Sequence, residues 1–182
     1  MGILPENDYL GSNEISMEYF WHYDAPLGGL TLESDGEALT GIRFDRQSSP
    51  DGVSEEVPGE KMRLPVFDET CRWLDIYFSG KAPDFTPKLY FRATPFRERV
   101  WQILLTIPYG ETMTYGEVAA LLARESGRKR MSAQAVGGAV GHNPIPLIIP
   151  CHRVIGTGGR LVGYTPGLDK KAFLLRLEQS KL

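Results

Sequence analysis

The chain has 182 residues, of which 42% are hydrophobic, and this is enough apolar material for one large domain or two small ones. Its two cysteines, Cys71 and Cys151, lie far apart, so neither a disulfide framework nor a zinc-type cluster of Cys and His is expected. The first residues lack a basic segment followed by an apolar core, and no apolar run approaches the length of a membrane span. We therefore expect a cytoplasmic protein with no membrane segment, metal or cofactor.

The net charge of −3 is unevenly distributed along the chain. Residues 1–90 carry 7 basic against 17 acidic side chains, a net −10, whereas residues 91–182 carry 13 against 6, a net +7. Such an asymmetry indicates that the second half faces nucleic acid. Four basic residues are gathered in one short stretch of that half: Arg124, Arg128, Lys129 and Arg130. The alternative is that these charges only solvate two faces of the protein.

The first half follows the pattern of a small sheet and a helix. Residues 1–16 form a polar lead-in, and short strand-like runs follow at 17–23, 29–33 and 38–44, separated by turn signals. Three sequential strands with tight turns predict an antiparallel meander. Residues 46–61 are rich in Ser, Pro, Gly and acid, which is typical of a surface loop. A helix is expected from about Leu64 to Gly80, with Cys71 inside it as a packing residue.

The second half predicts a helix-turn-helix. Helices are expected after the N-cap residues Thr94, Thr114 and Ser132, the second of them with a capping box to Glu117. Two of these helices flank the basic stretch, so helix, basic turn and helix form a candidate DNA-binding unit. A last helix is expected over residues 169–182, after a glycine-rich loop at 156–167.

The helix over residues 133–140 consists almost entirely of small residues. Its only long polar side chain is Gln134, so it lacks the set of side chains that reads base edges in the major groove. Ala135 and Gly138 would allow its backbone to press close to a partner. This favours binding without sequence preference, with phosphates held by the basic stretch. The alternative is that the small residues only allow close helix packing inside the protein.

The reactive candidate lies in residues 147–154, where a thiol, an imidazole and a guanidinium are adjacent. Residues 147–149 predict a short buried strand, and Pro150 suits the first position of a helical turn. Cys151 would then lie near a helix N-terminus, where His152 and Arg153 would help stabilise a thiolate. Because neighbouring side chains diverge, a bridging water or a third group would be needed to pass the proton. A buried structural cysteine and a thiol hydrolase remain alternatives.

This stretch resembles the active-site signature of the O6-alkylguanine-DNA alkyltransferases. The resemblance rests on Asn-Pro-Ile-Pro at residues 143–146 followed by Pro-Cys-His-Arg-Val at residues 150–154, a highly specific combination. It extends to further positions and covers nearly the whole chain after the lead-in: Tyr115, the small-residue helix, Gly163-Tyr164, Leu177-Glu178 and residues 74–80.

The resemblance implies an α+β fold in two domains. Residues 17–90 would form a small ribonuclease H-like domain with an antiparallel sheet and a helix. Residues 91–182 would form a mostly α-helical, winged-helix-like domain that binds DNA and accepts the alkyl group. The implied activity is irreversible transfer of an alkyl group from O6-alkylguanine to Cys151, once per molecule. The implied partner is double-stranded DNA, approached by a monomer from the minor groove with little sequence preference, and the base would be rotated out of the stack.

The resemblance also assigns roles to individual residues. Cys151 would be the nucleophile, polarised through a water by His152, which Glu178 orients, while Asn143 braces the turn and Tyr115 presses the target phosphate. The base pocket would be lined by Val154, Tyr164, Thr165 and Pro146. The DNA-binding residues would be Tyr115, Arg124, Arg128, Lys129, Arg130, Gln134, Ala135 and Gly138.

This sequence departs from the family pattern at a few places. Gln134 stands where well-known members have an arginine that fills the gap left by the flipped base, so base extrusion would be less favoured. Pro166 stands where the family often has glycine, which would stiffen the pocket rim. A related group binds alkylated guanine without repairing it, but there the reactive cysteine is replaced, and Cys151 argues against that reading. A regulatory helix-turn-helix protein would leave Cys151 without a role.

Overall fold

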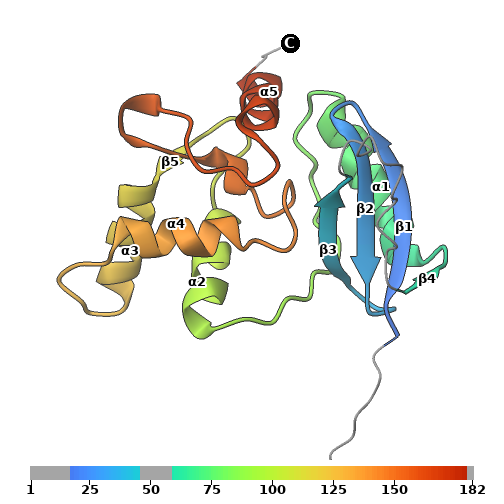
Figure 1. Cartoon of the computed structure of the whole chain (residues 1–182), viewed down its shortest axis with the longest axis horizontal. Coiled ribbons are helices and arrows are strands. Elements are labelled where there is room, and N and C mark those ends of the chain that lie inside the picture. Colours follow the sequence, from blue (N-terminus) through green and yellow to red (C-terminus); the bar gives the residue numbers. More distant parts are fainter. Residues whose placement is uncertain (1–16, 46–58, 180–182) are drawn as a thin grey trace, which may run out of the picture.

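The computed structural model describes residues 17–45 and 59–179 and places a sheet with its helix beside a group of helices (Figure 1). This confirms the expected α+β class, with the sheet in the first half and the helices in the second. The expected lead-in over residues 1–16, most of the expected loop over 46–61 and the end of the last helix lie outside the described residues. No helix in the described ranges is long and apolar enough to cross a membrane.

The sheet is built from three antiparallel strands and one short addition. Strands β1 (Tyr19–Ala25), β2 (Gly28–Ser34) and β3 (Leu39–Phe44) form the expected meander. Strand β4 (Glu60–Lys61) pairs in parallel with β1, so the order is β3-β2-β1-β4. The expectation of a loop through residue 61 is therefore wrong at its end. The Glu60 N–H reaches the Glu18 carbonyl at 2.8 Å, which extends the pairing of the sheet.

Helix α1 (Pro65–Phe78) covers one face of this sheet. Its buried residues recur at three- and four-residue intervals and include Phe67, Thr70, Trp73, Leu74 and Tyr77. They belong to the same hydrophobic core as Leu30, Leu32 and other inward residues of the strands. Cys71 is half-buried against this core, as the sequence predicts.

Three capped helices open the second half: α2 (Pro95–Leu104), α3 (Tyr115–Glu125) and α4 (Ala133–Gly141). The Thr94 and Ser132 side chains each accept a backbone hydrogen bond from the first turn, and Thr114 forms the expected capping box. The helix-turn-helix is thus present as α3 and α4. Arg99 of α2 binds Glu125 of α3 with two hydrogen bonds of 2.7 and 2.6 Å and fixes the two helices together.

The remaining elements connect the helix-turn-helix to the reactive stretch. A one-turn 3-10 helix, η1 (Cys151–Arg153), leads into β6 (Val154–Ile155), which pairs in parallel with β5 (Met113–Thr114). This pairing places the start of α3 beside the reactive cysteine. A second 3-10 turn, η2 (Thr157–Gly159), precedes the last helix, α5 (Leu168–Gln179).

Both halves of the chain meet at the reactive stretch. The edge strand β3 faces the helices (Figure 1), and the Ile42 N–H of β3 donates to the Pro144 carbonyl at 2.9 Å. The end of α1 lies close to α5, where the Tyr77 hydroxyl reaches Glu178. The sheet layer therefore supports the turn that carries the chemistry.

Candidate active site

The residues before Cys151 form a closed turn, so the expected strand over 147–149 is wrong. The Ile149 N–H donates to the Ile145 carbonyl at 2.9 Å, and Leu147 has a left-handed φ of 75°. Asn143 explains the turn, because its amide donates to the Ile149 carbonyl at 2.7 Å and its oxygen accepts from the Ile145 N–H at 3.0 Å. One side chain thus clamps both ends of the turn. Backbone strain at a non-glycine residue such as Leu147 is typical of functional sites.

Cys151 begins the 3-10 turn and is 5% exposed. Burial raises the pKa of its thiol to about 11, although the Asn143 side chain and the charge of Lys171 act in the opposite direction. The expectation that the turn and its cations favour a thiolate is therefore wrong for this structure. The turn is a single 3-10 turn, and the Arg153 guanidinium is bound to Glu178 and to the Ile107 carbonyl. The cysteine rests as a thiol and needs a base.

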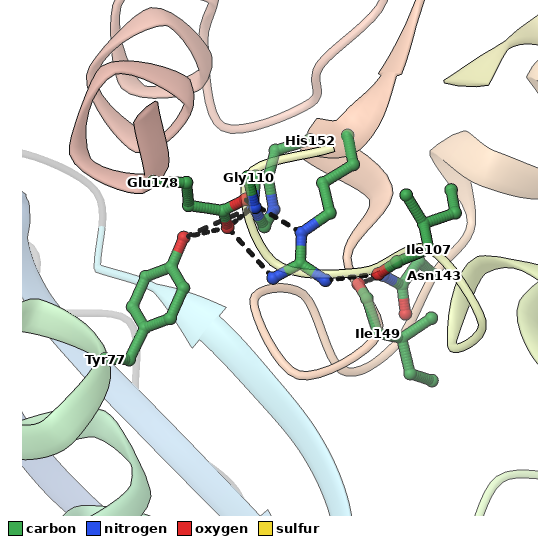
Figure 2. A network of polar contacts seen from close by, with 8 residues as sticks. Tyr77, Ile107, Gly110, Asn143, Ile149, His152 and Glu178 are labelled. Carbon is green, nitrogen blue, oxygen red and sulfur yellow. Dashed lines mark hydrogen bonds and ion pairs between the residues drawn. The ribbon is translucent and has the colours of Figure 1, made fainter. Parts of the chain in front are cut away.

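Glu178 of α5 binds several polar groups at once, including His152, Tyr77 and the Gly110 backbone (Figure 2). His152 Nε2 lies 2.6 Å from Glu178 Oε1. Arg153 donates to both carboxylate oxygens, at 2.9 and 3.1 Å, and the Gly110 N–H donates at 3.1 Å. The Tyr77 hydroxyl donates to Oε1 at 2.7 Å. The carboxylate is 1% exposed, so these donors replace the water that it has lost.

The charges in this network follow from its geometry. Burial alone would raise the pKa of Glu178, but hydrogen bonds and charges from His152 and Arg153 outweigh it and lower the pKa to about 2. Burial lowers the pKa of His152 by more than Glu178 raises it, so the imidazole is neutral at neutral pH. Against an ionised carboxylate, its one proton belongs on Nε2. Nδ1 then carries a lone pair, and it makes no hydrogen bond within the described part of the chain.

Lys171 is a buried cation that sequence reasoning missed. Its ammonium donates to the Val154 carbonyl at 2.6 Å and to the Val162 carbonyl at 2.8 Å, and burial lowers its pKa to about 8. A signal was available, because Lys171 and Glu178 fall on the same buried stripe of α5 as Leu174. Charged residues on an apolar stripe indicate a site. Tyr77 was also missed, since it looked like one more core residue of α1.

The residues expected to line the base pocket differ in their burial. Tyr164 is buried, its hydroxyl has no partner among the described residues, and burial followed by the nearby Cys151 raises its pKa well above the usual range. Val154 and Pro146 are also buried, whereas Thr165 is exposed and its hydroxyl reaches the Gly141 carbonyl at 3.3 Å. Three of these four residues are therefore buried, and Thr165 is exposed.

Tyr115 begins α3 and contacts the loop that precedes Tyr164. Its hydroxyl lies 3.1 Å from the Val162 carbonyl and 3.3 Å from the Gly163 carbonyl, in the loop before Tyr164. Burial followed by the nearby Cys151 raises the pKa of Tyr115. The phenol thus lies near the thiol and binds the loop carbonyls, and its contact with a target phosphate stays a prediction.

The small-residue helix α4 presents an open face. Gln134, Ala135 and Gly138 are exposed, and a Cβ on Gly138 would meet nothing within 4 Å. Internal packing therefore does not require glycine there, which weakens the alternative of close helix packing. That alternative does hold for Ala139, which is buried and accepts a hydrogen bond from Trp101 at 2.9 Å. The four basic residues of the turn are all exposed: Arg124, Arg128, Lys129 and Arg130.

Within residues 17–45 and 59–179, no three or more His, Cys, Asp and Glu side chains are arranged to hold a metal ion. The groups gathered at the reactive turn are the Cys151 thiol, the His152 imidazole and the Glu178 carboxylate, and a hydrogen bond of 2.6 Å joins the last two.

The fold and the site combine a helix-turn-helix, a unit typical of DNA-binding proteins, with a buried cysteine that is followed by a histidine. The family model described as "6-O-methylguanine DNA methyltransferase, ribonuclease-like domain" matches residues 19–91, and the one described as "6-O-methylguanine DNA methyltransferase, DNA binding domain" matches residues 95–180. The chain belongs to the 6-O-methylguanine DNA methyltransferase family.

Similar proteins match this chain over nearly its full length. The methylated-DNA--protein-cysteine methyltransferase of Mycobacterium tuberculosis (strain H37Rv) is 42% identical over 163 residues, covering 88% of this chain and 93% of the relative. That of Methanosarcina acetivorans is also 42% identical, covering 89% and 99%. The crystal structure of Mycobacterium tuberculosis OGT in complex with DNA has a TM-score of 0.74 at 41% identity, covering 89% of this chain and 93% of that one.

Proposed function

We propose that this chain repairs DNA directly, by moving an alkyl group from the O6 atom of guanine to Cys151 Sγ, once per molecule. Family membership supports alkyl transfer as the activity: the family description names 6-O-methylguanine, and the relatives' names give methylated DNA and a protein cysteine. The observation that carries the proposal for this site is His152 Nδ1, which has no hydrogen-bond partner among the described residues and belongs to the residue next to a buried thiol. A cysteine that served packing alone would need no such base.

The chemistry balances with groups that are present in the turn. The thiol proton passes to His152 Nδ1, through a water, while Sγ attacks the alkyl carbon. The S–C bond forms as the C–O6 bond breaks, the leaving guanine takes a proton from the Tyr115 phenol, and the proton held by His152 then returns through solvent to the Tyr115 phenolate. Glu178 stabilises the imidazolium that forms, because its pKa of about 2 keeps it ionised. The thioether product has no leaving group for hydrolysis, so each molecule acts once.

Docking on DNA follows from the face that α4 presents. Ala135 and Gly138 let the helix backbone approach a shallow minor groove, while the basic turn holds phosphates. The helix has no side-chain set for reading bases, which favours binding with little sequence preference. We propose that a monomer binds double-stranded DNA in this way and acts in the cytoplasm, where its substrate would be found.

The flipped base would occupy the space beside the thiol. Tyr164 offers a ring for stacking and a hydroxyl without a partner in the described chain, and Val154 offers its backbone to the base edge. Thr165 and Pro146 complete the rim and the floor. Pro166 stiffens this rim, and we propose that it narrows the range of bulky alkyl groups.

Stoichiometry tests this function. The protein is incubated with a duplex carrying one O6-methylguanine, the DNA is digested, and restored guanine is counted. The proposal predicts one guanine per protein molecule and no more, however long the incubation. Continued turnover with release of a free alcohol would instead support the thiol hydrolase. Binding of the lesion with no restored guanine would reduce the protein to a lesion sensor.

A further inference from the structure

One residue of the sheet layer contacts the hydrogen-bonded pair of His152 and Glu178, which we call the relay. Both residues of the relay come from the helical half. Tyr77 lies near the end of α1, is fully buried, and points its hydroxyl at Glu178 across the contact between the two halves (Figure 2). Its oxygen is 2.7 Å from Glu178 Oε1 and 3.2 Å from His152 Nε2. A hydroxyl confined to packing would not be placed between a carboxylate and an imidazole.

The direction of the hydrogen bonds follows from proton counting. The Tyr77 hydroxyl has one proton, and it goes to Glu178 because an ionised carboxylate is the stronger acceptor. Towards His152 the phenol oxygen can then only accept. The Nε2 proton of His152 therefore faces two acceptors, Glu178 Oε1 and the Tyr77 oxygen. The other tautomer would turn a lone pair towards both oxygens, so the arrangement selects the imidazole whose free nitrogen is Nδ1.

We propose that Tyr77 is a positioning residue for alkyl transfer: it holds His152 in the Nε2–H tautomer and shares the charge of Glu178. This rests on the proposed function of Cys151. Sharing the carboxylate weakens its pull on the imidazole, which keeps His152 neutral and able to take the thiol proton. The sheet layer thereby contributes a group to the reaction.

Other charged groups around His152 act in both directions. Glu178 favours the protonated imidazole, whereas Arg153 and Lys171 oppose it. The Tyr77 ring also packs edge-on against Tyr109, at 5.9 Å between ring centroids. None of these groups is altered when only the Tyr77 hydroxyl is removed, so Tyr77→Phe isolates its effect.

The test is Tyr77→Phe with Tyr23→Phe as the matched control. Tyr23 of β1 also donates to a carboxylate at 2.8 Å, that of Asp75, but this pair lies on the exposed side of the sheet layer, outside the relay. Single-turnover methyl transfer from duplex DNA is followed from about pH 5.5 to about pH 9, together with affinity for the unmodified duplex.

The expected result is a shift of the acid limb of the rate to higher pH. Without the hydroxyl, Glu178 pulls harder on His152, so Tyr77→Phe should move the limb up by about 0.5 to 1 pH unit. Transfer near pH 6.5 should fall about three- to tenfold and transfer near pH 8.5 less than about twofold, with duplex affinity unchanged. Tyr23→Phe should follow the native profile. An equal loss at every pH, or no change, overturns the proposal.

A second measurement keeps the proposal testable if the chain transfers no alkyl group. The chain has three histidines, so the ring signals of His152 can be followed by NMR in the native protein and in Tyr77→Phe. The proposal predicts the Nε2–H tautomer in the native protein and a higher pKa for His152 in the variant. An unchanged pKa, or the Nδ1–H tautomer in the native protein, contradicts it whether or not transfer occurs.

Discussion

The surroundings of the two cysteines raise the pKa of both thiols by burial but differ in the charged and polar groups that lie nearby. Burial raises the pKa of both Cys71, on α1, and Cys151, in the reactive turn, to about 11. Beyond burial, Asp75 raises the pKa of Cys71 further, whereas Asn143 and Lys171 lower that of Cys151. The thiol pKa in the unliganded protein therefore does not distinguish a structural cysteine from a reactive one.

The difference lies in what can receive the proton. Cys151 precedes a neutral imidazole, His152, whose Nε2 is held by Glu178 and whose Nδ1 has no hydrogen-bond partner in residues 17–45 and 59–179. Cys71 has acidic neighbours within its helix, and these repel a thiolate. The comparison teaches that the reactive thiol is defined by its base and by the carboxylate that holds the base, so the sharpest tests act on those groups.

Removing the carboxylate should have the largest effect. Glu178→Gln leaves His152 without its anchor and Arg153 as a buried cation without a counter-charge. Transfer should fall on the order of 100-fold, and the free energy of unfolding should fall by about 3 kcal/mol. Single-turnover kinetics and urea unfolding measure the two effects.

The matched control is Glu125→Gln, which breaks the other Arg–Glu pair with two hydrogen bonds. Its partners, Arg99 and Glu125, are 48% and 39% exposed, so water replaces the lost contact. Transfer should stay near native, with a much smaller fall in stability. If the two variants behave alike, burial of the network is not what gives Glu178 its importance.

Acid should remove the same contribution to stability. The pKa of Glu178 is about 2 in the folded protein and ordinarily about 4.5, so its stabilisation is complete above about pH 4.5 and is lost as the pH falls towards 2. This loss amounts to about 3 kcal/mol. Urea unfolding of the native protein across this range should therefore show a steeper loss of stability with acid than Glu178→Gln, in which only the other carboxylates titrate. Parallel slopes in the two proteins would contradict the low pKa.

Lys171→Met should change the reactivity of Cys151 and leave that of Cys71 unchanged. Loss of the buried cation raises the pKa of Cys151 further, so transfer at neutral pH should fall about tenfold, the value of one pKa unit. Cys71 should keep its reactivity towards iodoacetamide. Lys170→Met is the control, since the same substitution at the neighbouring position leaves the carbonyls of Val154 and Val162 with their partner. An equal fall in the transfer rate in both variants would show that the buried charge of Lys171 does not act on Cys151.

The smallest expected effect concerns DNA rather than the thiol. Gln134→Arg supplies a longer side chain on the exposed face of α4, which would fill the gap left by the flipped base. Transfer from duplex DNA should speed up by about fivefold, or about 1 kcal/mol of barrier, with little change on single-stranded DNA. A matching gain on both substrates would show that Gln134 does not act in base extrusion.

Sequence reasoning succeeded where structure is local. The caps at Thr94, Thr114 and Ser132 are settled by a few neighbouring residues, and all three helices begin where these caps predict. The strands of the meander and the stripe of α1 follow from short-range periodicity in the same way. The pairing of β1 with Glu60–Lys61 does not, because those residues lie far along the chain.

The site was harder to predict where distant residues meet. An apolar run at 147–149 favours a strand, but the side chain of Asn143 closes it into a turn with a left-handed Leu147. The thiolate expectation failed because the sequence does not reveal that the Cys151 side chain is desolvated. Tyr77 lies 101 positions from Glu178, and its spacing on α1 matches that of ordinary core residues. Only the folded chain shows that its hydroxyl faces the relay.

The central claim is that Cys151, and not Cys71, receives the alkyl group. The direct measurement is the intact mass of the protein after incubation with a duplex carrying one O6-methylguanine, followed by mass mapping of the two cysteine peptides, with Cys151→Ser and Cys71→Ser alongside. The account predicts one added methyl group, about 14 Da, on the Cys151 peptide of the native protein and of Cys71→Ser, and none in Cys151→Ser. A methyl group on Cys71, or any gain in Cys151→Ser, would contradict it.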